Sequence, residues 1–101
     1  MIDLAAHHID EIRRILREQL PRCEVLAYGS RVEGGAQRYS DLDLAVRAPE
    51  GRAAAKRLSA ARDAFFESDL PIMVDLVDWH DLSATLRDHV RATAVVIQSA
   101  P

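Results

Sequence analysis

The chain has 101 residues, of which 49% are hydrophobic and 29% charged, and its formal net charge is −3 at pH 7. These values predict one globular domain over residues 1–101 and exclude a disordered chain. Acidic residues outnumber lysine plus arginine, so direct binding of nucleic acid is not expected. No long apolar segment occurs and the single cysteine, Cys23, cannot form an internal disulfide, so we expect no membrane association and a cytoplasmic protein.

The first part of the chain is predicted to form a helix followed by two strands. Apolar residues recur every three or four positions over 3–20, which predicts an amphipathic helix that ends before Pro21. Extended-type residues over 25–28 predict a strand that stops at a glycine–serine turn. After a loop, polar and apolar residues alternate over 41–47, which predicts the second strand.

The second part of the chain continues the alternation of helices and strands. An alanine-rich segment over 52–67, with Phe65 and Phe66 near one side, predicts a second long helix. The remaining elements are a third strand over 72–77, apolar enough for a central strand, a helix over 81–92 capped by Asp81, and a fourth strand over 94–98. This order predicts an α+β sandwich in which helices flank a small mixed sheet of about four strands.

The most informative stretch joins a glycine turn to two carboxylates. Gly29 and Ser30 end the first strand, where a turn into a helix start would leave backbone N–H groups free to bind an anion. After ten further residues, the second strand carries Asp41 and Asp43 on one face. These like charges repel each other, and a hard cation such as magnesium, arriving with the phosphates of a nucleotide, would stabilise the pair.

Simpler interpretations exist for each of these features taken alone. The D-x-D pattern is weak, because metal-dependent glycosyltransferases also contain it, and two surface acids on a strand would look the same. Gly29 could be an ordinary turn glycine and Ser30 a helix cap. The histidines have no spacing to one another or to Cys23 that suits a zinc site.

The combination of these motifs resembles a known family. The spacing from G-S to D-x-D is similar to the signature of the DNA polymerase β-like nucleotidyltransferase superfamily. The sequences G-S-R-x-x-G, over 29–34, and S-D-L-D-L, over 40–44, resemble those of its smallest members, the minimal nucleotidyltransferases (MNT). The resemblance covers nearly the whole chain and implies the nucleotidyltransferase fold.

The resemblance also implies the residues of a site. In the family a third acid lies on a later strand, and Asp75 is preferred over Asp78 because it lies inside the apolar run that Asp78 ends. The implied catalytic and metal-binding residues are Asp41, Asp43 and Asp75. The implied nucleotide-binding residues are Gly29, Ser30, Arg31, Arg38 and Ser40. One departure is Glu33, where family members often carry a basic residue.

The family further implies a reaction and a partner. The reaction is the transfer of AMP from ATP to a hydroxyl group, with two magnesium ions as cofactors. Such proteins are commonly encoded beside a small helical HEPN-type protein, and many act as antitoxins that neutralise this ribonuclease toxin by adenylylating it within a hetero-oligomer. The alternative is a non-enzymatic antitoxin or subunit that neutralises its HEPN-like partner by binding alone.

Overall fold

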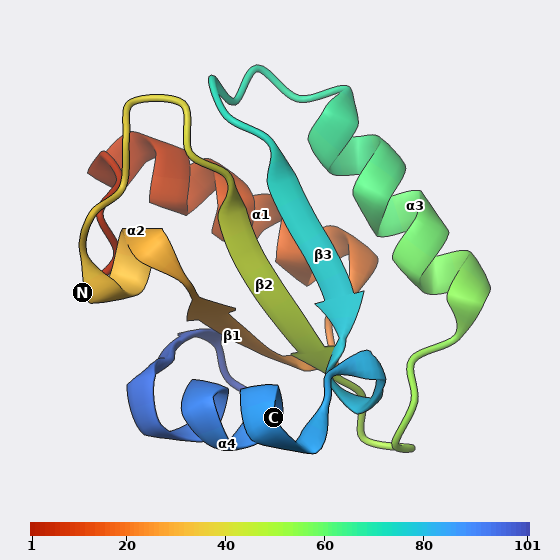
Figure 1. The fold of residues 1–101 in the computed structure, drawn as a ribbon. Helices are drawn as coiled ribbons and strands as arrows, with labels where there is room; N and C mark the ends of the chain where they lie inside the picture. Colours follow the sequence, from red (N-terminus) through yellow and green to blue (C-terminus); the bar gives the residue numbers. More distant parts are fainter.

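A four-stranded mixed sheet with the order β3-β2-β1-β4 forms the centre of the computed structural model, which describes residues 1–101 (Figure 1). β1 (Glu24–Tyr28) is antiparallel to both β2 (Leu42–Arg47) and β4 (Val95–Gln98). β2 and β3 (Val74–Asp78) are parallel, and a crossover through a helix joins them, as parallel neighbours require. The predicted α+β fold with a small mixed sheet is confirmed.

The two long helices α1 (Ala6–Gln19) and α3 (Ala55–Phe66) pack side by side on one face of the sheet, and α4 (Ala84–Thr93) packs on the other (Figure 1). Two short helices were not predicted, namely α2 (Ser30–Glu33), which follows β1, and η1 (Trp79–Asp81), which follows β3. None of the helices combines the length and the apolar character needed to cross a membrane.

The alternation of residues along β2 divides it between two cores. Leu42 and Leu44 are fully buried in the larger core, beneath α1 and α3. Ala45 points to the opposite face, where it is buried with Val90 of α4. Asp43 points to this second face as well, but it is only partly buried. The sheet therefore has one closed face and one face that leaves room for a polar site.

The position of β3 differs from the prediction, because β3 is an edge strand and not a central one. The strand is rich in apolar residues because its two faces pack against two different cores. Leu76 is 1% exposed in the larger core, and Val77 packs against the smaller one. Helices on both faces therefore bury the apolar residues of β3, although one of its edges has no neighbouring strand.

Two further local predictions were wrong. Asp81 does not cap the last helix: it ends η1, and the cap is Ser83, whose Oγ accepts a hydrogen bond of 3.1 Å from the backbone N–H of Leu86. Phe65 and Phe66 also do not share a buried side, since Phe65 is 5% exposed and Phe66 is 77% exposed. Successive helix residues are about 100° apart, and Phe66 is the last residue of α3, where the helix extends past the core.

Candidate active site

Two carboxylates from distant parts of the sequence meet on neighbouring parallel strands. Asp43 of β2 is the register partner of Asp75 of β3, so the two side chains lie next to each other on the same face of the sheet. Burial raises the pKa of Asp43, and the negative charges of Asp75 and Asp41 raise it further. The three predicted acids therefore act on one another electrostatically.

These acids do not by themselves form a complete metal site. Asp41 lies just before β2 and is exposed, as is Asp75. No group of three or more His, Cys, Asp or Glu side chains is arranged to hold a metal ion. The donor type nevertheless suits magnesium, which prefers oxygen ligands and is usually bound by one or two carboxylates together with water and substrate phosphates.

The competing acid, Asp78, has a different environment. Its side chain is 1% exposed and lies on the opposite face of β3 from Asp75. Its carboxylate accepts hydrogen bonds of 2.8 Å from the backbone N–H groups of both Ala53 and His80. Asp78 thus joins the end of β3 to the segment before α3, and only Asp75 lies beside Asp43.

The turn after β1 lies against the carboxylate of Asp43. Gly29 has φ 84° and ψ −159°, a region that essentially only glycine adopts. A Cβ atom at this position would lie 2.4 Å from Oδ2 of Asp43, which is far closer than a carbon and an oxygen can approach. Ser30 then begins α2, whose first backbone N–H groups have no partner within the helix. The absence of a side chain at Gly29 therefore allows the start of α2 to approach the acids.

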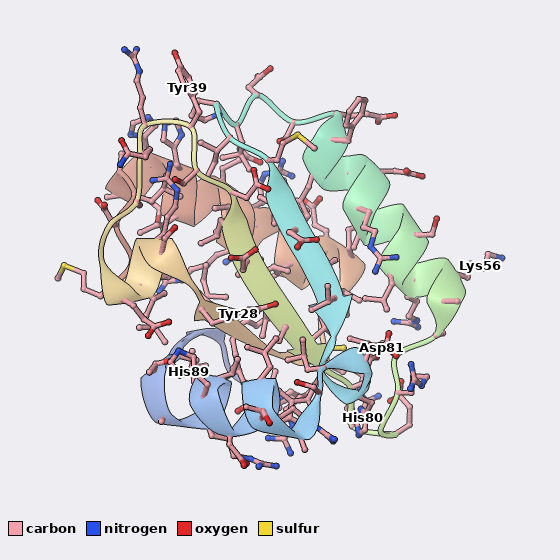
Figure 2. All side chains as sticks on the ribbon, in the orientation of Figure 1. Tyr28, Tyr39, Lys56, His80, Asp81 and His89 are labelled. Carbon is pink, nitrogen blue, oxygen red and sulfur yellow. The ribbon has the colours of Figure 1, made fainter.

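Tyr28 is a site residue that the sequence analysis missed. It is the register partner of Asp43 across β1 and β2, and Figure 2 shows its side chain on the sheet face beside α4. Burial, together with the charges of Asp43 and Asp75, raises the pKa of Tyr28 to about 12. The hydroxyl is therefore protonated at neutral pH and available as a hydrogen-bond donor. The antiparallel pairing that places it opposite Asp43 was the only signal that could have identified it.

Arg31 is buried, with 6% of its surface exposed, and its side chain binds the loop that follows α2 and the N-terminal segment. Its guanidinium group donates to the backbone carbonyls of Ser40 (2.9 Å), Asp3 (2.8 Å), Gln37 (3.2 Å) and Arg38 (3.0 Å). These bonds hold the loop between α2 and β2 in place. A direct contact of Arg31 with phosphate would require some of them to break, so its predicted nucleotide contact stays a prediction.

The other predicted nucleotide contacts lie in the same loop. Arg38 is exposed, and its guanidinium carbon lies 5.3 Å from the ring centre of Tyr39, which Figure 2 shows at the outer end of the loop. The hydroxyl of Ser40 accepts a hydrogen bond of 2.8 Å from the backbone N–H of Gln37. Arg38 is thus free to reach a ligand, whereas Ser40 already stabilises the turn.

Glu33 connects two elements that border the site. Its carboxylate lies 2.9 Å from Nε2 of His89, so an exposed ion pair or hydrogen bond links α2 to α4. Figure 2 shows His89 on the side of α4 that faces α2. Position 33 therefore supplies no cation to a phosphate.

The mixed sheet, the glycine turn and the paired carboxylates are features of a nucleotidyltransferase domain. The family model described as nucleotidyltransferase domain matches residues 9–98, and the chain therefore belongs to this family. The resemblance found in the sequence is confirmed. The specific roles of the individual site residues stay predictions.

Known proteins place the chain more narrowly within this family. It is 41% identical over 97 residues to the probable protein adenylyltransferase MntA of Haemophilus influenzae, covering 96% of this chain and 84% of the relative. It is similar to a chain of a toxin–antitoxin structure with AMP-PNP, with a TM-score of 0.73 and 26% identity over 91% of this chain and 73% of that one. A complex of a tri-AMPylated HEPN toxin and an MNT antitoxin from Shewanella oneidensis shares the fold, with a TM-score of 0.66 and 23% identity over 93% of this chain and 71% of that one. The chain is thus a nucleotidyltransferase of the minimal type.

Proposed function

We propose that this protein transfers AMP from ATP to a hydroxyl group on a HEPN-type partner protein, and that this modification makes it the antitoxin of a toxin–antitoxin pair. The similarity to a probable protein adenylyltransferase and to chains of toxin–antitoxin complexes, one of them with an ATP analogue, supports the donor and the type of partner. The observation that carries the proposal is the pairing of Asp43 with Asp75 on adjacent strands, beside the turn at Gly29.

The reaction requires an in-line displacement at the α-phosphate. The oxygen of the acceptor hydroxyl forms a bond to the α-phosphorus, the bond from that phosphorus to pyrophosphate breaks, and the proton of the hydroxyl goes to a base. Asp75 is the proposed base, because it is exposed at the edge of the sheet where an acceptor can approach. Asp41 and Asp43 are the proposed ligands of magnesium, which when bound neutralises charge on the triphosphate and the leaving pyrophosphate.

The glycine turn and the following loop are proposed to bind the phosphates. The backbone N–H groups of Ser30 and Arg31, which begin α2, and the hydroxyl of Ser30 follow directly after the Gly29 turn that lies against Asp43. Arg38 is exposed and can turn toward a triphosphate. Arg31 contributes indirectly, because its bonds to four backbone carbonyls keep this loop in one shape.

A transfer assay tests this function and separates it from neutralisation by binding alone. The protein is incubated with its HEPN-type partner, magnesium and ATP labelled at the α-phosphate, and mass spectrometry locates the added AMP. We expect labelled partner with the wild type and a loss of at least about a hundredfold for Asp43→Asn or Asp75→Asn. Asp10→Asn, an exposed acid of α1 outside the paired carboxylates, is the control. If Asp43→Asn still inhibits the ribonuclease as well as the wild type does, neutralisation by binding alone is the correct function.

A further inference from the structure

A groove runs along the free edge of β3, between this strand and the C-terminal end of α3. Its volume is about 430 Å³, and most of its lining residues are hydrophobic. Two of them are exposed far more than large apolar side chains usually are, Phe66 by 77% and Met73 by 57%. Apolar surface exposed on opposite walls of one groove indicates a surface that another chain covers.

This groove is continuous with the paired carboxylates. Asp75 is one of its lining residues and is also the register partner of Asp43. Met73 lies one pleat before Asp75 and on the same face of the strand. A chain seated in the groove would therefore reach the acids without crossing any other part of the protein.

The edge of β3 also offers unpaired backbone groups. The N–H of Leu42 in β2 donates to the carbonyl of Met73, so residues 73, 75 and 77 turn their backbone groups toward β2, and Val74 and Leu76 turn theirs outward. Arg62 of α3 donates two hydrogen bonds, of 3.0 and 2.8 Å, to the outward carbonyl of Leu76. No side chain caps the outward groups of Val74, so an extended segment can pair with them.

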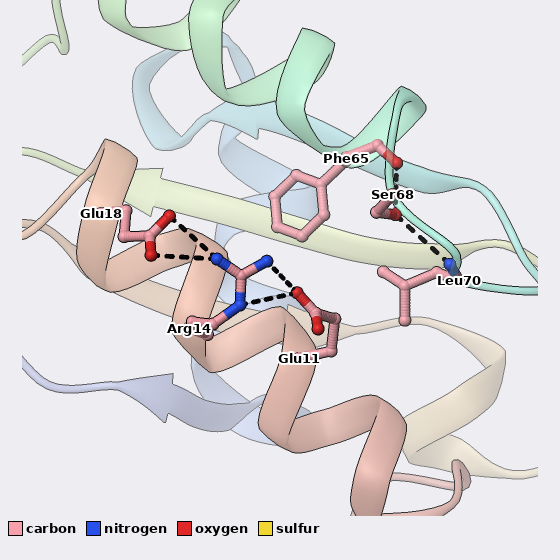
Figure 3. Close-up of polar contacts among 6 residues, drawn as sticks. All are labelled: Glu11, Arg14, Glu18, Phe65, Ser68 and Leu70. Carbon is pink, nitrogen blue, oxygen red and sulfur yellow. Dashed lines mark hydrogen bonds and ion pairs between the residues drawn. The ribbon is translucent and has the colours of Figure 1, made fainter.

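The charge around the groove is net negative, because four acids outnumber the one cation that lines it, Arg62. Asp63 and Asp75 line it, and Glu67 and Asp69 belong to the connection that closes one end; none of the four takes part in an ion pair. The nearby Arg14 of α1 does not compensate them, because Glu11 and Glu18 already bind its guanidinium group (Figure 3).

The connection after α3 has a defined shape. The hydroxyl of Ser68 donates a hydrogen bond of 2.6 Å to the carbonyl of Phe65 and lies 3.4 Å from the N–H of Leu70, as Figure 3 shows. These contacts fold the chain back immediately after Phe66 and place Leu70 in the wall of the groove. The groove is therefore formed before any partner binds, which lowers the entropic cost of binding.

We propose that this groove binds an extended segment of the acceptor protein that carries the reactive hydroxyl, and that this segment is apolar with basic residues around the hydroxyl. The inference rests on the proposed function and adds to it the surface and the chemistry of acceptor recognition. The apolar side chains of the segment contact Phe66 and Met73, its basic side chains face the four acids, and its hydroxyl reaches Asp75 at the end of the groove.

Two tyrosine peptides of eleven residues serve as probes. In the first, lysine and leucine alternate around a central tyrosine, and in the second glutamate replaces every lysine. Amide chemical shifts of the full chain are recorded with each peptide. We expect the lysine peptide to shift the amides of Phe66 and Val74 and to bind at least tenfold more tightly than the glutamate peptide. Equal binding of the two peptides, shifts confined to another surface, or no shifts at millimolar peptide would overturn the proposal.

Substitutions on the groove wall provide a second test. Phe66→Ser removes an apolar contact and Glu67→Lys reverses a charge, so each should weaken binding of the lysine peptide at least fivefold. Both residues are exposed, so neither substitution should disturb the core. Val96→Ser, at an exposed apolar residue on the opposite edge strand, is the matched control and should have no effect. Circular dichroism checks that each variant is folded. Unchanged binding by folded Phe66→Ser and Glu67→Lys would refute the groove as the docking site.

Binding and transfer are measured separately, so that the two proposals can fail separately. If the lysine peptide binds in the groove but neither it nor the HEPN-type protein receives AMP, the transfer function is wrong and the docking site remains. If the HEPN-type protein receives AMP at the same rate with Phe66→Ser as with the wild type, the docking site is wrong and the function remains. Shifts of the groove amides on raising the protein concentration alone would instead assign the groove to a second copy of this chain.

Discussion

The close approach of Gly29 to Asp43 gives a prediction whose size follows from the geometry. Alanine at this position would have to adopt φ 84° and ψ −159°, which costs about 1 to 3 kcal/mol. Its Cβ would also lie 2.4 Å from Oδ2 of Asp43, and relieving such a contact costs about 1 to 3 kcal/mol more. Because the partly exposed Asp43 side chain can rotate, we expect Gly29→Ala to destabilise the fold by about 2 to 4 kcal/mol.

Thermal and urea unfolding measure this effect. For a domain of this size, a loss of 2 to 4 kcal/mol corresponds to a fall in Tm of roughly 10 to 20 °C. Gly35→Ala is the matched control, because Gly35 has φ 85° but a Cβ there would have no atom within 4 Å. The control should lose only about 1 to 2 kcal/mol, the cost of the left-handed backbone.

A double-mutant cycle isolates the contact between the two residues. In the Asp43→Ala background the carboxylate is absent, so Gly29→Ala should cost less than it does in the wild type, by about 1 kcal/mol or more. If Gly29→Ala is no more destabilising than Gly35→Ala, or if its cost is the same in both backgrounds, the turn does not lie against the carboxylate as described.

Three further predictions concern the acids, the loop and the partner. The pKa of Asp43 is raised in the folded protein, so its ionised form destabilises the fold. Asp43→Asn should therefore be more stable than the wild type at pH 7 without metal, by less than about 1 kcal/mol. In urea titrations this difference should vanish below about pH 4, where the wild-type carboxyl is protonated in both the folded and the unfolded state. Arg31→Met should cost about 2 to 3 kcal/mol in urea unfolding, since it removes the charged donor of four partly buried hydrogen bonds. Exposed Arg38→Met should cost less than about 0.5 kcal/mol and instead raise the KM for ATP. Single-turnover transfer of AMP should be fast only with the HEPN-type partner present, because positioning two reactants can lower a barrier by about 7 to 11 kcal/mol, and rapid transfer to a free small alcohol would contradict this.

The sequence alone determined the features that depend on neighbouring residues. Asp41 lies two residues before Asp43, close enough for its charge to raise the pKa of Asp43, and Gly29 ends the first strand in a backbone conformation that only glycine adopts readily. The buried stripe of α1 follows from its helical period, and Ile12 and Leu16 are indeed fully buried. Each of these depends on only a few consecutive residues, so a local pattern was sufficient to predict it.

The tertiary structure decided the features that depend on which segments pair. The parallel register of β2 and β3 brings Asp75 beside Asp43, and the antiparallel register of β1 and β2 adds Tyr28. The same pairing leaves β3 at the edge of the sheet, although its apolar sequence predicted a central strand. The loop after α2 binds the guanidinium group of Arg31, for which the sequence predicted a nucleotide contact. Register and strand order are set by the packing of the whole core, because the free energy that selects them comes from contacts between residues far apart in the chain.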